Sequence, residues 1–211
     1  MRTAALLLVL TMIAAPAIAQ DDPDQAVAGA SVAEGWSIRT DRGRGEENVS
    51  LQVDDGVFNL TLGPRVIFYR ETDQGSGEYT VSATFTQLAA NRHNEAFGLF
   101  IGGDDLQGSG QRYSYFLLRG DGKFLVKNRT GNETSNVSSG WTRHEAINAD
   151  NSDGQSSDEL TVQVSGGRVS FLVNGTEVYS GSSGLYTEGV YGMRANHNLH
   201  LRIEGFEATP R

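Results

Sequence analysis

The chain has 211 residues and no cysteine, and its 17 Lys and Arg residues are outnumbered by 26 Asp and Glu residues, for a formal net charge of −9. A surface of that sign repels phosphate backbones and anionic lipids, so nucleic acids and membrane surfaces are poor candidate partners, whereas neutral glycans remain compatible. The lack of cysteine also excludes a disulfide framework and a lipid-modified N-terminal cysteine, so packing must stabilise the fold.

Residues 1–19 have the features of a cleavable secretion signal. Arg2 gives a positive start, Ala4–Ala15 form an uncharged apolar run, and Pro16–Ala19 supply the small residues that precede a signal-peptidase cut. The run is short for a membrane-spanning helix and acidic residues follow it at once, so no transmembrane anchor is expected to remain. We therefore expect an exported chain, periplasmic or extracellular, and an exported protein without cysteine points to a bacterial source.

Residues 20–33 are acidic and then rich in alanine and glycine, which predicts a flexible acidic tail before a single domain over residues 34–211. From Gly35 onward, short runs of β-branched and aromatic residues alternate with turn pairs such as Gly63-Pro64 and Asn174-Gly175. The predicted strands are residues 49–53, 57–62, 65–69, 79–85, 96–101, 113–119, 123–129, 160–164, 169–173, 176–179, 190–195 and 199–206. No later segment shows a sustained 3.6-residue apolar period, so the predicted fold class is all-β, with two antiparallel sheets packed face to face.

The clearest hairpin joins residues 113–119 to residues 123–129 through Gly120-Asp121-Gly122. Alternation places Phe116 and Phe124 toward the core and gathers tyrosine and cationic side chains on the other face. A saccharide needs a flat apolar ring for its C–H face and donors for its hydroxyls, and the cations would also suit an acidic polysaccharide. The alternative is an ordinary solvated sheet face. The candidate ligand-binding residues are Tyr113, Tyr115, Arg119, Lys123, Lys127 and Trp141.

The two tryptophans have different expected roles. Trp36 follows Gly35 at the start of the domain and is expected to plug one end of the sandwich. Trp141 follows Ser138-Ser139-Gly140, and the sequence leaves open whether it is an exposed stacking platform or an anchor for its loop.

No catalytic residue is predicted. The four histidines show no metal-binding spacing, and the chain has neither a nucleophile-elbow motif nor a glycine-rich phosphate loop. Glu71-Thr72-Asp73 begins like the paired carboxylates of a retaining glycosidase but runs into the predicted turn Gln74–Gly77. No cofactor or metal is predicted, because the loop aspartates that could attract calcium lack a spaced calcium-loop motif and fit solvated turns better. These aspartates are Asp104, Asp105, Asp150, Asp153 and Asp158.

Five runs of the chain resemble the concanavalin A-like lectin/glucanase sandwiches, over a span from Trp36 to Phe206. They are Glu95–Ile101, Tyr113–Phe124, Leu160–Val164, Val169–Gly175 and Gly189–Met193. Within that superfamily the runs are most like laminin-G-like domains and the exported 3-keto-disaccharide hydrolase-like domains of bacteria. The resemblance implies a jelly-roll fold and a link to carbohydrates.

Three functions remain open at this point. The leading hypothesis is an exported, non-catalytic module that binds a glycan or an envelope polymer. The first alternative is a saccharide-acting hydrolase of the 3-keto-disaccharide hydrolase-like type, which convergent carboxylates or histidines in a concave pocket would favour. The second is a structural or protein-interaction sandwich, which a flat apolar patch would favour. The oligomeric state is not predicted.

Overall fold

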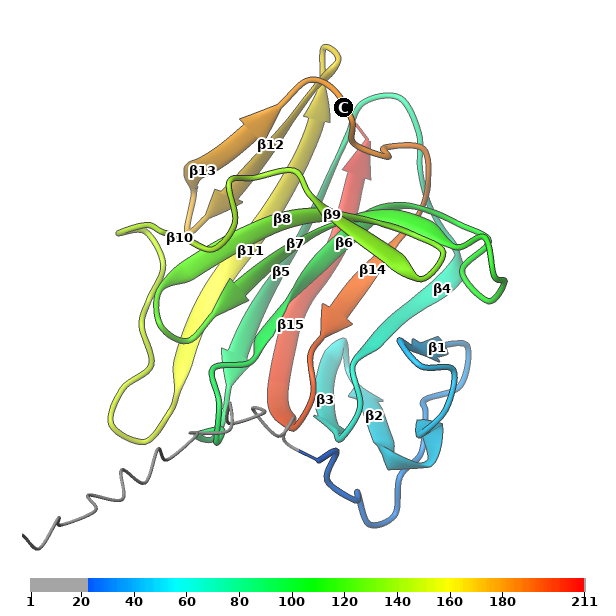
Figure 1. The fold of residues 1–211 in the computed structure, drawn as a ribbon, viewed down its shortest axis with the longest axis vertical. Helices are drawn as coiled ribbons and strands as arrows, with labels where there is room; N and C mark the ends of the chain where they lie inside the picture. Colours follow the sequence, from blue (N-terminus) through cyan, green and yellow to red (C-terminus); the bar gives the residue numbers. More distant parts are fainter. Residues whose placement is uncertain (1–22, 211) are drawn as a thin grey trace, which may run out of the picture.

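The computed structural model describes residues 23–210, so the predicted secretion signal, residues 1–19, lies outside the described residues. The described chain forms two antiparallel sheets stacked face to face (Figure 1). The predicted all-β sandwich is therefore confirmed. Within the same residues, no helix is long and apolar enough to cross a membrane.

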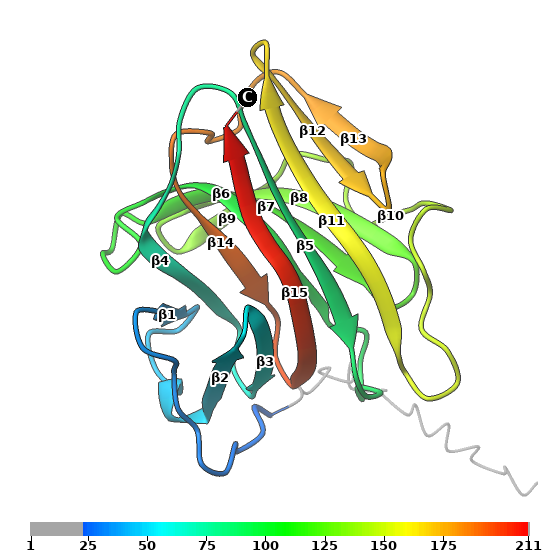
Figure 2. The same cartoon turned by 180° about the vertical axis from the view of Figure 1, so that it is seen from behind.

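The eight-stranded sheet lies in front in Figure 1, and the seven-stranded sheet lies in front in Figure 2. The first has the order β1 (Ser37–Thr40), β4 (Val66–Gly75), β14 (Gly189–Ala195), β6 (Ala96–Asp104), β7 (Arg112–Arg119), β8 (Lys123–Thr130) and β10 (Thr142–Arg143), with β9 (Glu133–Asn136) also paired to β8. The second has the order β13 (Thr176–Gly181), β12 (Arg168–Val173), β11 (Ser156–Ser165), β5 (Tyr79–Gln87), β15 (Leu199–Pro210), β3 (Val57–Leu62) and β2 (Val49–Asp54). A short 3₁₀ helix (Glu46–Asn48) precedes β2, and a bulge interrupts the β12–β13 ladder.

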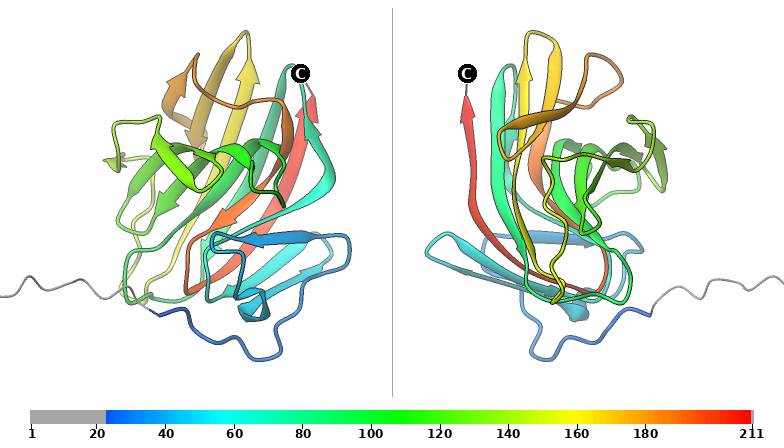
Figure 3. Two further views of the ribbon diagram at one scale, coloured as in Figure 1. Left: turned by 45° about the vertical axis from the view of Figure 1, so that its right-hand side comes forward. Right: turned by 90° about the vertical axis from the view of Figure 1, so that its left-hand side faces the viewer.

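The core lies between the two sheets, which Figure 3 shows one behind the other. It is built by the two-residue period of the strands, most regularly in β5, where alternate residues from Tyr79 to Phe85 are buried. Phe85 stacks on Phe97 of the opposite sheet, with ring centroids 5.6 Å apart. Phe116 and Phe124 also belong to this core, which confirms the predicted inward face of the β7–β8 hairpin.

Trp36 packs against the margin of the core, where its ring centroid lies 5.0 Å from that of Phe58 and 5.9 Å from that of Phe206. The guanidinium of Arg70 covers the ring at 5.2 Å. These contacts agree with the packing role predicted for this tryptophan.

A second buried cluster lies on the other face of the eight-stranded sheet, away from the core. Its members are Ile67, Tyr69, Ala96, Phe100, Leu106, Tyr113, Tyr115, Leu117 and Val190. The cluster corrects one expectation, because Tyr113 is 1% exposed and Tyr115 is 4% exposed, so their rings are not an open platform. Alternation assigns a side chain to a face, but it does not say that a loop residue such as Leu106 packs over that face.

Residues 23–33, which belong to the predicted tail, run beside β2 and β3. The backbone N–H of Gln25 donates to the side-chain oxygen of Asn198 at 2.8 Å. Val32 forms a parallel bridge with Leu51 of β2. This part of the chain therefore has defined partners along the β2 edge of the seven-stranded sheet.

Candidate functional site

The six predicted ligand-binding residues lie on one face of the eight-stranded sheet, the face turned away from the core. The register of β7 and β8 sets Tyr115 beside Lys127 and Arg119 beside Lys123. Trp141, just before β10, packs against the second buried cluster on the same face. We call this surface the cationic face, and it consists of Arg119, Lys123, Lys127, Arg129 and Arg194 with Tyr113, Tyr115 and Trp141.

The accessible part of the cationic face differs from the part that the tyrosines form. The side chains of Arg119 and Lys123 are 21% and 30% exposed. Lys127 and Trp141 are half-buried, whereas Tyr113 and Tyr115 are covered. A ligand would therefore meet the cations and the indole first, above a floor of tyrosine rings.

Arg194 of β14 lies at the centre of this floor and was not among the predicted residues. Its guanidinium donates to both carboxylate oxygens of Asp41, at 2.9 and 2.8 Å, and to the hydroxyl of Tyr113 at 2.8 Å. It also lies 4.9 Å from the ring centroid of Tyr115. Asp41 forms a second ion pair, 3.1 Å long, with Arg129. One carboxylate thus holds two cations of the face in place.

Burial and charge act in opposite directions on the groups of this network. Burial alone would raise the pKa of Asp41, but the charge and hydrogen bonds of Arg194 and the charge of Arg129 bring it below its usual value. Burial raises the pKa of Tyr113 to about 12, so its hydroxyl stays protonated. Burial lowers the pKa of Lys127, and the neighbouring charge of Arg194 lowers it further. The face is therefore a place where an added cation is unfavourable and an added anion is favourable.

The other end of the face is a small network around Trp141. Arg119 donates to both carboxylate oxygens of Asp121 at 2.7 Å, and Lys123 pairs with the same carboxylate at 2.9 Å. These hydrogen bonds, those of Arg119 first, lower the pKa of Asp121 to about 2. The guanidinium of Arg119 also lies 4.6 Å from the Trp141 ring centroid. The indole is thus held in position by a planar cation.

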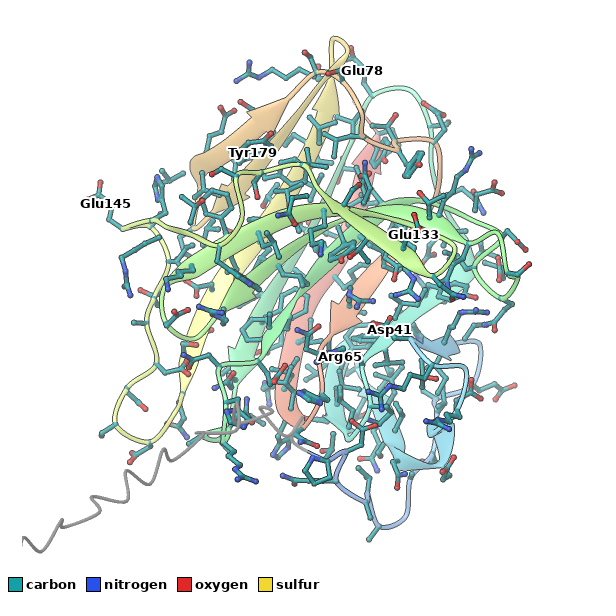
Figure 4. The ribbon with its side chains drawn as sticks, viewed as in Figure 1. Asp41, Arg65, Glu78, Glu133, Glu145 and Tyr179 are labelled. Atoms are coloured by element: carbon teal, nitrogen blue, oxygen red, sulfur yellow. The ribbon has the colours of Figure 1, made fainter. Side chains whose placement is uncertain are left out.

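A cavity of about 380 Å³ adjoins the network through Asp41. Asp41 and Arg65 lie near one another in Figure 4, and the lining also includes Arg42, Arg44, Asp24, Glu47 and His197. His197 Nε2 is 2.6 Å from Glu95 Oε1, and its Nδ1 is 3.4 Å from Asp24 Oδ1. Burial raises the pKa of Glu95 despite the nearby imidazole. No sequence motif could predict this pair, because Glu95 and His197 are far apart in the chain.

Four of the five aspartates considered as calcium ligands have carboxylates engaged in loop contacts. Asp104 pairs with Arg112 at 3.0 Å, and Asp105 accepts a hydrogen bond from the backbone of Gly110 at 2.9 Å. Asp150 accepts from Ser156, and Asp158 accepts from the side chain of Asn174. Over residues 23–210, no three His, Cys, Asp or Glu side chains are grouped so as to hold a metal ion. The expectation that the chain needs no cofactor remains a prediction.

Comparison with known proteins identifies the fold of this chain but not its activity. No family model matches the sequence, and no curated protein matches it either. Among solved structures, a Bacillus subtilis protein of unknown function with a galectin-like fold is 12% identical, with a TM-score of 0.59 over 83% of this chain and 89% of that one. The carbohydrate-binding module CBM66 of Bacillus subtilis is 10% identical, with a TM-score of 0.54 over 82% and 94%.

Two further similar structures carry different printed functions. The carbohydrate recognition domain of Emp46p, in a metal-free form, is 12% identical, with a TM-score of 0.51 over 82% of this chain and 87% of that one. A double-cysteine variant of the alginate lyase A1-II′ is 11% identical, with a TM-score of 0.52 over 84% and 95%. At such identities the likeness shows the fold alone. The chain has a galectin-like jelly-roll sandwich, which confirms the jelly-roll fold that the sequence resemblance implied.

Proposed function

We propose that this chain is an exported, non-catalytic module that binds a saccharide polymer on the cationic face. The observation that carries the proposal is the grouping of Trp141 with Arg119, Lys123 and Lys127 on one accessible surface. An indole offers a flat apolar surface to the C–H face of a sugar ring, and the flanking cations donate hydrogen bonds to its oxygens. A folded sheet fixes these groups before the ligand arrives, so little conformational entropy is lost on binding.

Two of the similar structures support a saccharide as the ligand. One is named a carbohydrate-binding module and the other a carbohydrate recognition domain, and both share the sandwich over more than four-fifths of this chain. Their names supply the class of ligand, and the cationic face supplies a surface that could receive it. Export completes the proposal, because a module for an envelope or extracellular polymer must leave the cytoplasm.

Replacement of Trp141 by alanine tests this proposal directly. We expect the purified variant to be retained about tenfold less strongly on insoluble polysaccharides and glycan arrays, because a central aromatic contact often contributes that much to binding. The matched control is Arg202→Gln, which removes a cation from the outer face of the seven-stranded sheet. Equal retention of wild type, Trp141→Ala and the control on every glycan that binds would contradict the assignment of the ligand to this face.

A second candidate function, saccharide hydrolysis, is favoured by the cavity beside Asp41. Its wall includes His197 and Asp24, and Glu95 contacts the His197 imidazole from outside the lining, so an imidazole and two carboxylates converge as acid–base chemistry requires. The raised pKa of Glu95 would suit a proton donor. If the chain is a hydrolase, wild-type protein should release reducing ends or sugar products from an added saccharide, and Glu95→Gln should abolish the release. Absence of product with wild-type protein across neutral and keto-sugar substrates would leave the binding module as the function.

A further inference from the structure

We infer that the saccharide taken up by the cationic face carries an anionic group, a carboxylate or a sulfate ester, and that Lys127 selects it. This inference rests on the proposed binding function and names its ligand class. It is carried by the ammonium of Lys127, which has no acceptor among the described residues, by the neighbouring guanidinium of Arg194, and by the charge balance of the face around them.

The charge balance of the cationic face is opposite to that of the whole chain. The face gathers Arg119, Lys123, Lys127, Arg129 and Arg194, and the carboxylates that pair with these cations are Asp41 and Asp121. The chain as a whole has a net charge of −9. A local excess of positive charge within an acidic protein costs free energy through self-repulsion, and a bound anion relieves that cost.

Lys127 is the cation on which this excess is concentrated. Its neighbours across the ladders are Tyr115 on β7 and Asn136 on β9, and neither carries a charge that could balance it. Among residues 23–210, its ammonium has no hydrogen-bond or ion-pair partner. After burial, the charge of Arg194, another cation, also lowers the pKa of Lys127. A half-buried ammonium in these surroundings lacks the anion that normally accompanies such a group.

Arg194 adds a second positive charge on the other side of Tyr115, and one of its N–H groups has no acceptor within residues 23–210. Its terminal nitrogens are engaged by Asp41 and Tyr113, but its Nε is buried and has no partner in the described part of the chain. A buried N–H without a partner is costly and rare in folded proteins. Lys127 lies beside Tyr115 in the ladder, and the Arg194 guanidinium lies against the ring of the same tyrosine. An anionic group bound to the half-buried ammonium of Lys127 would therefore be attracted by the charges of both cations.

Paired polysaccharides that differ only in charge test the inference. Retention of wild-type protein is compared on dextran against dextran sulfate, and on polygalacturonate against its methyl ester. We expect at least one charged polymer to be retained about tenfold more strongly than its neutral partner, the gain typical of one charge-assisted hydrogen bond. The pair that shows the preference identifies the anion as sulfate or carboxylate.

Variants separate specific recognition from diffuse attraction. Lys127→Gln should remove the preference for the charged polymer, Lys127→Arg should keep most of it, and Arg202→Gln on the opposite sheet should leave it unchanged. Equal losses in Lys127→Gln and Arg202→Gln would overturn the inference, because they would show attraction without a site. Equal retention of charged and neutral polymers, with Trp141→Ala still weakened, would also overturn it while leaving the proposed function intact. Retention of no polymer at all would remove both.

Discussion

Arg194 is almost fully buried, and its position depends on a single carboxylate. Its side chain is 4% exposed, and Asp41, which binds it through both oxygens, is 23% exposed. Such a pair contributes less to stability than its short distances suggest, because both ions lose hydration. Removal of one partner has a larger effect, since the remaining ion keeps its desolvation cost without compensation.

Asp41→Asn should therefore destabilise the fold and change its response to acid. We expect a loss of about 3 kcal/mol in the free energy of unfolding at neutral pH. The folded-state pKa of Asp41 lies below its usual value of 3.8, so its contribution is complete above that pH and is lost as the pH falls through the folded-state pKa. Urea unfolding from pH 7 to pH 2.5 should show wild type and variant converging at low pH. Two parallel curves would contradict this role of Asp41.

At the residue scale, the sequence predicted correctly which face of a sheet a side chain lies on, but not whether that side chain is exposed to solvent. Phe116 and Tyr115 are neighbours, and alternation correctly sent the first to the core and the second to the opposite face. It could not predict that Tyr115 is covered, because part of the cover, the Arg194 guanidinium, comes from β14, far along the chain. Arg194 could have been singled out from the sequence, because it lies within the largely apolar run 190–195. An arginine in a buried strand needs a charged or polar partner.

At the element scale, strands bounded by specific turn residues were the ones predicted well. Asn174 and Gly175 adopt φ angles of 50° and 78°, and such left-handed conformations favour these two residues at a two-residue turn. The missed elements β1, β9 and β10 are short, and each is defined by the longer strand it pairs with. β4 also continues to Gly75, through residues predicted to turn, because β14 pairs with it there.

The segment in front of β1 gives an element-scale prediction, which concerns Gly63. A Cβ atom at this position would lie 2.1 Å from the backbone oxygen of Gln25, so Gly63→Ala should displace residues 23–27. Amide hydrogen exchange at Gln25 and Val27 should become faster, because their hydrogen bonds to Asn198 and Asn48 are lost.

Gly181→Ala in β13 is the matched control for this change, because a Cβ atom there would make ordinary contacts, the nearest at 3.5 Å. Its exchange pattern over residues 23–27 should equal that of wild type. Unchanged protection of Gln25 in Gly63→Ala would show that the segment is held by contacts other than those along β3.

At the scale of the whole molecule, the fold could be predicted from sequence patterns that jelly-roll sandwiches share. The candidate site could not, because it depends on how charged residues of this particular chain are arranged in space. Period-two alternation and turn glycines appear in the sequence directly. The net charge of −9 does not, however, reveal a face with the opposite balance. That balance arises because β14 brings Arg194 next to residues some 80 positions earlier in the chain, such as Tyr113. Composition averages over the surface, and binding depends on the local field.

The two edge strands of the seven-stranded sheet, β2 and β13, are protected in different ways against pairing with a second copy of the chain. At the β2 edge, Val32 of the same chain forms a parallel bridge with Leu51 and so covers part of the edge strand. Along β13, a bulge opposite Phe171 and Leu172 of β12 interrupts the ladder, and Arg168 and Glu177 form an ion pair between the two strands at 3.0 Å. A strand from a neighbouring copy can add to a sheet only where a regular edge strand has free backbone N–H and C=O groups. In concentrated solutions, copies of this protein should therefore resist edge-to-edge pairing through the seven-stranded sheet.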